Sequence, residues 1–430
     1  MLRTSVLAVA LAALGSPVFA QPYRLTESFA KDAQYHVRCD VDINGTLTLM
    51  VKDKATPLKL AGKSTIAYDE RILQVNAERR VERTVRSYKQ LDFERKVGDQ
   101  PQQAKLRPEA LLLVILRHNQ YEVPFSPKAP LLWGEIELVR TDVFVPALVG
   151  LLPGDPVRIG DRWSPDKVSV QELTDLDRID ESTLVCTFDQ ITNVGNRKHA
   201  LIRLEGKVKG IGEDGHALHE IRGNCYVDLD ANFISYISIV ATHHLLDKKG
   251  DAIGRIAGTL TITRGAAQTQ DLNNAALGNL KLEPDADNTM LLFDHPTNGT
   301  RFIYPRNWRV AGFNDKQIAV DERKGSGLLI TLSPANQTPN GQKFHQDTLA
   351  FLTKENAKIF REEKPRAMQG DMEAFSFEAE LGKERVWLQY YSLRQNNQGA
   401  TIAARLVQTD QQNSLRDAER IVRSLQLRGK

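Results

Sequence analysis

The short stretch CDVDINGTL carries the residue types and spacing that open a calcium-binding loop. Asp40, Asp42 and Asn44 stand at alternate positions before Gly45, and oxygen donors of this kind bind Ca²⁺. A helix–loop–helix calcium site also needs a bidentate glutamate at the twelfth loop position, where this chain has Val51. Apolar residues alternate on both sides of Asn44-Gly45, a dipeptide that suits tight turns. The pattern therefore predicts a β-hairpin turn at Asn44-Gly45.

A second stretch, PLKLAGKST, resembles the end of a phosphate-binding loop. Gly62, Lys63 and Ser64 match its last three positions, but the first glycine of the motif would fall on Pro57. No apolar strand leads into a following helix, as that motif requires. We expect a surface turn here and no bound nucleotide.

Four of the nine histidines lie close together in two strand-like segments; they are His216, His219, His243 and His244. Zinc needs three or four donors that converge on one point. In an extended chain, residues that are adjacent or three apart point to opposite faces, so each segment offers one histidine to a shared face. Two donors are too few without helpers such as Glu220 or Asp247. We therefore expect solvated or capping histidines and no metal.

The three cysteines, Cys39, Cys186 and Cys225, allow at most one disulfide. Cys186 and Cys225 are predicted to be buried thiols on neighbouring strands, with a disulfide between them as the alternative. No cysteine has the exposed, cation-flanked setting of a nucleophile. The chain contains neither a G-x-S-x-G nor an H-E-x-x-H motif. We accordingly predict no catalytic, cofactor-binding or metal-binding residue.

The first twenty residues read as a secretory signal peptide. One arginine precedes an apolar run from Val6 to Leu14, and Val18-Phe19-Ala20 forms a small-x-small cleavage pattern. This pattern predicts an exported protein, periplasmic or extracellular, with a retained N-terminal anchor as the alternative. The run is too short to span a bilayer, and no later stretch approaches the roughly 20 apolar residues of a membrane helix. We expect no transmembrane segment.

Composition limits the class of protein further. The 430 residues carry a formal charge of +3, with 41% apolar and 26% charged residues, which is typical of globular proteins. A balance so close to neutral provides no electrostatic surface for nucleic acid. The length exceeds what one hydrophobic core usually serves, so two or three domains are expected.

The elements before residue 266 are predicted to be mainly strands, from runs such as LLLVIL, LVCTF and YISIV. One helix is expected near 130–140, where Leu132, Ile136 and Val139 follow Pro130 at helical spacing. The turn-rich stretch LLPGDPVRIGDRW suggests a hinge between two β-rich lobes, residues 21–152 and 153–265. The polar residues 266–288 are expected to form a linker with little to bury.

The last part of the chain, residues 289–430, mixes strands with two helices. The strands are predicted at QIAV, GLLITL, EAFSFEAE, ERVWLQYYSL and TIAARLV, and one helix at QDTLAFLTKENAKIF. A terminal helix is expected behind a capping Ser414. Its apolar stripe comprises Leu415, Ala418, Ile421, Val422 and Leu425.

One strand of this part, VWLQYYSL, places aromatic side chains on both faces. Trp387 and Tyr391 share one face, while Leu388 and Tyr390 share the other. We expect one face to lie under a helix. The other face is either exposed for a partner or also buried.

Two resemblances follow from these motifs. The series FIYPRNWRV, GLLITLSP, AFSFEAELGKERVWLQYYSL and DAERIVRSLQL resembles the PsbP-like fold, an antiparallel sheet covered by helices. The stretches LRPEALLLVILR and LLPGDPVRIGDRW resemble parts of secreted bacterial proteins in which a VGDxW-type turn opens a β-rich domain. The PsbP-like resemblance implies an interaction module rather than an enzyme and assigns no binding residue.

These observations predict an α+β protein with β-rich lobes and a PsbP-like C-terminal domain. Its expected function is that of a secreted or periplasmic non-enzymatic accessory protein that binds another protein through the C-terminal domain. Two alternatives remain open. The β-rich part could carry an apolar ligand or lipid, as EALLLVILR and FVPALVGLL suggest. A hydrolase whose site is assembled from distant residues is the second alternative.

Overall fold

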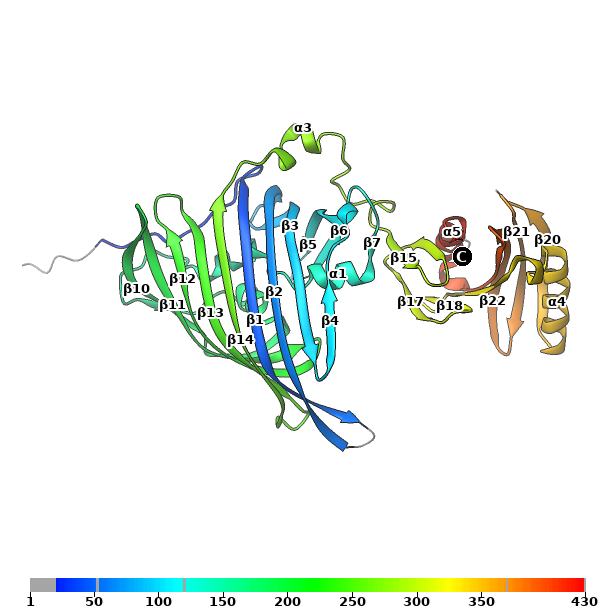
Figure 1. Ribbon diagram of the computed structural model, residues 1–430, viewed down its shortest axis with the longest axis horizontal. Coiled ribbons are helices and arrows are strands. Elements are labelled where there is room, and N and C mark those ends of the chain that lie inside the picture. Colours follow the sequence, from blue (N-terminus) through cyan, green and yellow to red (C-terminus); the bar gives the residue numbers. More distant parts are fainter. Residues whose placement is uncertain (1–20, 52–53, 119–120, 369, 429–430) are drawn as a thin grey trace, which may run out of the picture. The chain divides into compact units, whose positions relative to one another are not determined.

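Figure 1 shows the computed structural model, which describes residues 21–51, 54–118, 121–368 and 370–428. Antiparallel strands dominate these residues, with a smaller share of helices, so the expected β-rich α+β class is confirmed. The predicted signal peptide, residues 1–20, lies outside the described residues. Every helix of the described part is too short or too polar to cross a lipid bilayer.

The chain forms two compact units, each made of segments that are distant in sequence. The first unit contains residues 21–28 and Val145–Thr261, and the second contains Phe29–Phe144 and Ile262–Lys430. The division expected from the sequence follows chain order, with boundaries near 152, 265 and 288. The compact units group the segments differently, because the chain leaves the second unit at Phe144 and returns to it at Ile262.

The first unit is an antiparallel sheet of order β14-β13-β12-β11-β10-β8, with β9 paired to β11. Its elements are α2 (Lys167–Thr174), β8 (Arg162–Trp163), β9 (Leu176–Ser182), β10 (Val185–Val194), β11 (Arg197–Gly212), β12 (Gly215–Asp228), β13 (Phe233–Leu246) and β14 (Ala252–Ala266), whose last residues belong to the second unit. Trp163 pairs with Cys186 of β10, and its indole nitrogen donates to the Leu151 carbonyl at 2.9 Å. The VRIGDRW turn thus leads directly into this sheet.

The N-terminal part of the second unit is a sheet of order β6-β5-β3-β2-β1, with β4 paired to β3. Its strands are β1 (Gln34–Val51), β2 (Lys54–Val75), β3 (Val81–Val97), β4 (Gln100–Ala104), β5 (Leu112–His118) and β6 (Tyr121–Phe125). The predicted strand LLLVIL corresponds to β5, in which Leu113, Val114 and Ile115 are fully buried.

The hairpin turn predicted at Asn44-Gly45 is wrong. Both residues lie inside β1, where Asn44 pairs with Ala61 and Gly45 with Leu60. The β1–β2 ladder continues to the pair Val51–Lys54, so the sheet register overrides the local turn preference of Asn-Gly. The surface turn expected at Gly62-Lys63-Ser64 is wrong for the same reason, since all three residues pair within β2.

The predicted helix near 130–140 is confirmed as α1 (Trp133–Val139), which follows β7 (Leu131–Leu132) and buries Ile136 and Val139. The backbone N–H of Leu132 donates to Glu135 Oε2 at 2.8 Å. That carboxylate also pairs with Arg107 at 2.8 Å, which fixes the start of the helix against the chain before β5.

Residues 266–288 bury more than the sequence suggests. They contain α3 (Asn274–Leu277), and Leu272 and Leu277 are buried against Val114 and Phe125 of the N-terminal sheet. The prediction of a linker with little to bury is therefore wrong at these leucines. Isolated leucines in a polar stretch reveal no periodicity, so only the tertiary fold shows that they belong to a core.

The C-terminal region, residues 289–428, contains two sheets. The smaller has the order β24-β16-β15-β7, to which the earlier segment Leu131–Leu132 contributes β7, and the larger has the order β17-β18-β19-β23-β22-β21-β20. Their strands are β15 (Leu291–His295), β16 (Thr300–Tyr304), β17 (Trp308–Phe313), β18 (Gln317–Glu322), β19 (Gly327–Pro334), β20 (Lys358–Ala367), β21 (Met372–Leu381), β22 (Glu384–Gln395), β23 (Gln398–Val407) and β24 (Gln426–Leu427). All five strands predicted in this region are confirmed.

Two helices accompany the seven-stranded sheet, with boundaries that differ from those predicted. Helix α4 (Gly341–Lys354) begins after the cap Asn340 and ends before Lys358-Ile359-Phe360, which belong to β20. Helix α5 (Gln411–Arg423) begins three residues before Ser414, so Ser414 is not its cap. The Ser414 hydroxyl instead donates to the buried Glu322 at 3.1 Å.

Candidate functional site

The seven-stranded sheet of the C-terminal region has two faces that are covered to different extents. Alternation along β19 turns Leu328 and Ile330 to one face and Leu329 to the other. Helix α5 lies on the first face. Glu322 of β18 is on the same face as Leu328 and accepts a hydrogen bond from Ser414 of that helix. Helix α4 lies on the opposite face, where Leu352 packs with Phe375 and Phe377 of β21.

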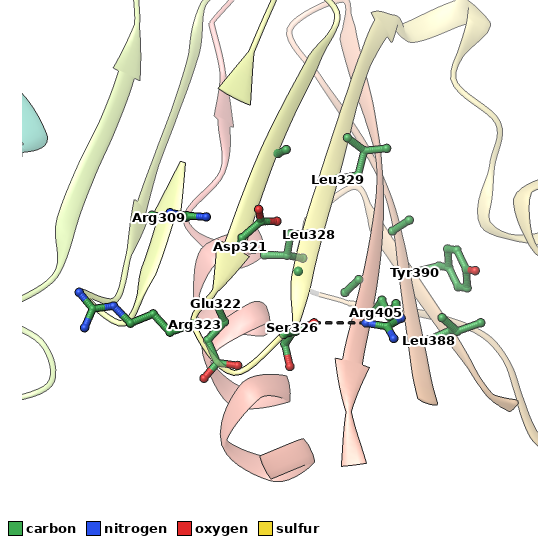
Figure 2. Close-up of a pocket in the computed structure, with 15 residues that line it drawn as sticks. Arg309, Asp321, Glu322, Arg323, Ser326, Leu328, Leu329, Leu388, Tyr390 and Arg405 are labelled. Carbon is green, nitrogen blue, oxygen red and sulfur yellow. Dashed lines mark hydrogen bonds between the residues drawn. The ribbon is translucent and has the colours of Figure 1, made fainter. Parts of the chain in front are cut away.

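A concavity, here called the bay, occupies the part of this second face over β18, β19 and β23. Figure 2 shows the side chains that line it, including Leu329, Tyr390 and Arg405. It has a volume of about 720 Å³. A neighbouring hollow of about 380 Å³ shares Leu329, Tyr390 and Ala403 and continues to Phe344 and Phe351 of α4. Together they form one open surface beside α4.

The strand register arranges the floor of the bay in rows across the sheet. One row is apolar and runs through the paired residues Ala319, Leu329, Ala403 and Tyr390. The next row is charged at several positions and runs through Arg309, Asp321, Gly327, Arg405 and Leu388. The bay therefore has an apolar end towards α4 and a charged end towards the β18–β19 turn.

Two arginines at the charged end have unused hydrogen-bonding capacity. Arg309 and Arg323 are exposed, and neither side chain forms an ion pair or hydrogen bond with another residue in the described part of the chain. The Asp321 carboxylate also has no such partner there. Arg405 is already engaged, because it donates to Glu384 at 2.5 Å and to the Gly325 carbonyl at 3.2 Å. The charged end thus offers two free guanidinium groups and one free carboxylate.

The aromatic strand β22 has helices on both faces. Tyr391 is buried on the face of α5, where Glu419 and Arg423 act on it electrostatically, and burial raises the pKa of its phenol. Leu388 and Tyr390 pack into the core under α4. Burial raises the pKa of Tyr390 to about 12. Two-sided burial is therefore correct for most of this strand, and Tyr390 also lines the bay.

The structure brings together two of the four clustered histidines. His219 of β12 and His243 of β13 are direct cross-strand partners, with ring nitrogens 3.0 Å apart. His244 lies on the other face, 4.0 Å from Glu220. Burial, with a smaller effect of the neighbouring histidines, lowers the pKa of His219 to about 3. Among the described residues, no group of three or more His, Cys, Asp or Glu side chains is arranged to hold a metal ion.

The three cysteines are free and buried. Cys186 and Cys225 are not on neighbouring strands as expected, because β11 lies between β10 and β12 and contributes Leu204 and Ile202 as their partners. Two strand spacings amount to roughly 9–10 Å, which exceeds the Cα separation that a disulfide allows. Burial raises the pKa of the Cys186 thiol to about 12, which removes nucleophilic character.

The aspartates of the calcium-like stretch serve the β1–β2 ladder. Asp40 accepts from Arg38 at 2.8 Å and from the Thr65 hydroxyl at 2.9 Å. Asp42 lies 3.4 Å from Lys63 of β2. Each carboxylate thus neutralises a nearby cation on the sheet surface.

Sequence reasoning missed the residues of the bay. Arg309, Asp321 and Leu329 lie on three different strands, and only their register brings them together. The available signal was the alternation in GLLITL, which turns Leu329 away from the buried Leu328 and Ile330. That signal did not show whether a helix covers this face.

Comparisons with known proteins show only weak and partial similarity. No protein-family model and no curated protein matches the chain. Among solved structures, cyanobacterial PsbP from Synechocystis sp. PCC 6803 is 9% identical and covers 32% of this chain and 92% of its own, with a TM-score of 0.27. The Ran-binding protein Mog1p of Saccharomyces cerevisiae is 10% identical over 32% and 95%, with a TM-score of 0.26. Lipovitellin is 10% identical over 57% of this chain and 26% of its own, with a TM-score of 0.29. A partial likeness to the PsbP fold is thus present, and it assigns no function.

Proposed function

We propose that this chain is an exported, non-enzymatic accessory protein that binds another protein through its C-terminal region. The observation that carries the proposal is the bay, an open half of a sheet face beside α4. Its apolar floor and two unpaired arginines combine contact area with charge, as protein interfaces do. Leu329 is 41% exposed and Phe351 is 58% exposed. Large apolar side chains gathered on one open surface, here the bay and the neighbouring hollow, are typical of interaction sites.

Site-specific photocrosslinking in the full chain tests this proposal. A photoreactive phenylalanine analogue replaces Leu329 in one variant and Val240, an exposed residue of β13, in the control. We expect one identified protein to be crosslinked from position 329 and not from 240. Its recovery in a quantitative pull-down should also fall with the Leu329→Asp substitution. A partner recovered equally by the wild type and this variant would argue against the bay, and a chain that retains no protein would argue against the function.

A carrier of an apolar ligand is the second candidate, and the β1–β2–β3 ribbon favours it. One face of this ribbon carries the register partners Leu47 and Leu58, together with Leu60 and Val97. The opposite face carries Asp42 and Lys63. Such a one-sided apolar ribbon suits a lipid-like molecule as well as a protein core.

Native mass spectrometry of the gently purified full chain separates the two candidates. A bound mass of a few hundred daltons that solvent extraction removes would support the carrier. A bare chain that still pulls down its protein partner would favour the accessory role. Turnover in a broad hydrolase screen would contradict both, because neither candidate includes catalysis.

A further inference from the structure

The bay is bounded on one side by a helix that covers only part of the sheet face. Helix α4 contacts β20, β21 and β22, and its Leu352 closes the core over Phe375 and Phe377. On the same face, β23, β19 and β18 lie beyond α4 in the sheet order. From β22 to β18 the sheet extends three strand spacings, roughly 14 Å. This width accommodates one further helix, whose diameter with side chains is about 10–12 Å.

The flank of α4 that borders the bay has the pattern of a helix–helix contact. Phe344 and Phe351 are two helical turns apart and line the same hollow, with Thr348 between them. Residues at this spacing form one stripe along a helix. Phe344 already contacts Phe375 and Tyr390 edge-on, whereas Phe351 is 58% exposed. A second helix lying beside α4 would cover Phe351.

The floor of the bay has small residues that allow the backbone of a partner to approach the sheet closely. Small residues, Ala319, Ala403 and Gly327, occupy positions on both sides of Leu329 in the rows described above. Gly327 has no side chain, which keeps this part of the floor low, and a Cβ atom at this position would lie 3.2 Å from the Asp321 carboxylate. Leu329 projects above these small residues and can insert between the side chains of an incoming helix.

The charged residues at the other end of the bay determine which kind of partner segment can bind there. Arg309 and Arg323 lie near the β18–β19 turn, and Figure 2 shows both on the side of the bay away from Tyr390. Neither has a side-chain partner in the described part of the chain, and Asp321 is the one carboxylate on this floor without a partner there. A carboxylate-rich segment would therefore pair with two guanidinium groups, which bind carboxylates in bidentate geometry.

We propose that the bay receives an amphipathic helix of a partner protein, lying beside α4 with acidic residues at the end that meets Arg309 and Arg323. This inference rests on the proposed function and specifies the partner's binding element. The apolar stripe of the incoming helix packs on Leu329, Ala403 and Phe351, which is a helix-in-groove mode of recognition. The new helix completes the helical layer on this face of the sheet.

The test uses a phage-displayed library of helical peptides panned on the full chain. We expect the recovered peptides to carry apolar residues at i, i+3 or i+4 and i+7, and acidic residues grouped at one end. A labelled recovered peptide is then titrated against variants by fluorescence anisotropy. Leu329→Asp should weaken binding by about tenfold or more, and so should the double variant Arg309→Glu with Arg323→Glu. Val240→Asp, an exposed control on β13, should leave the affinity unchanged.

Several outcomes would overturn the inference. These are the recovery of basic or non-helical peptides, equal binding by Leu329→Asp and the wild type, and failure to enrich any peptide. Thermal unfolding of each variant confirms that it is folded, and Leu329→Ser serves as a milder second variant. A protein partner that crosslinks to the bay through an extended strand would refute the helix and leave the proposed function intact. Peptide binding without any captured protein would refute the proposed function instead.

Discussion

Arg86 and Asp142 form an ion pair of 2.8 Å in which both side chains are almost completely inaccessible to solvent. Arg86 also pairs with Glu70 at 2.8 Å. Its guanidinium carbon lies 4.5 Å from the ring centroid of Tyr68 and 5.3 Å from that of Phe144. Asp142 and Phe144 belong to the segment after α1, whereas Glu70 and Tyr68 belong to β2. This cluster therefore ties that segment to the sheet.

Removal of the central cation should destabilise the protein strongly. Arg86→Met leaves Glu70 and Asp142 buried without their partner, and breaking a buried pair in this way costs about 3–5 kcal/mol. Urea unfolding would measure the loss. Arg95→Met on the same strand is the matched control, because Arg95 is exposed, donates to the Gln102 side chain at 2.7–2.9 Å and lies over the Phe93 ring. Similar unfolding free energies for the two variants would contradict the structural role of the cluster.

The pH dependence of stability should reveal a proton in this cluster. Burial raises the pKa of Asp142 from 3.8 to about 7, although Arg86 acts in the opposite direction. The folded chain then binds a proton that the unfolded chain has lost, so this contribution is complete below about pH 3.8 and disappears as the pH rises through 7. Besides burial, the neighbouring side chains that act on the pKa of Asp142 are those of Arg86, Glu70 and Tyr88 on the sheet.

Asp142→Asn isolates that contribution, because an amide does not titrate. The unfolding free energy of the wild type should fall relative to the variant by up to about 1.4 kcal/mol per pH unit between pH 5 and 7. Chemical denaturation at several pH values measures this difference. A constant difference across that range would show that Asp142 is ionised throughout.

The His219–His243 pair should produce the opposite trend. Burial lowers the pKa of His219 to about 3 and also lowers that of His243. The unfolded chain then gains protons below about pH 6.5 that the folded chain does not bind. The stability contributed by the neutral pair is thus present above pH 6.5 and is lost as the pH falls towards 3.

Replacement of His219 by leucine should remove much of this acid sensitivity. Relative to the variant, the wild type should lose unfolding free energy between pH 6.5 and 4.5, which denaturation at matched pH values would detect. His36→Gln is the control, since His36 is exposed and pairs with Asp69 at 3.0 Å. If the difference in unfolding free energy between the wild type and His219→Leu stayed the same from pH 6.5 to 4.5, the pair would not be the source of the acid sensitivity.

Two leucines of the C-terminal region should respond very differently to truncation. Leu352 of α4 is 1% exposed within the core over β21, so Leu352→Ala should cost about 2–5 kcal/mol. Leu329 faces the bay and is 41% exposed, so Leu329→Ala should change stability by less than about 0.5 kcal/mol. Thermal unfolding compares them, and a large loss at Leu329 would mean that the floor of the bay is buried in solution.

Local patterns predicted the elements well where burial and periodicity agree. The strands GLLITL and TIAARLV and the helix at Ile136 and Val139 all carry one apolar face, and the structure buries that face. The predictions failed where two physical preferences compete. Asn44-Gly45 prefers a turn, but the long β1–β2 ladder gains hydrogen bonds by continuing through it. Ser414 is a good cap by type, yet the helix starts earlier and Ser414 bonds Glu322 instead.

The sequence by itself determined the α+β class, the positions of five C-terminal strands and the absence of a recognisable catalytic motif, because these depend on residue type and short-range periodicity. Only the tertiary structure decided which surfaces stay open. Whether Leu329 is covered depends on how far α4 extends across the sheet. The ion pair between Arg86 and Asp142 joins two residues that are 56 positions apart in the sequence. Contacts of that kind arise from strand register and helix placement, which one sequence does not reveal.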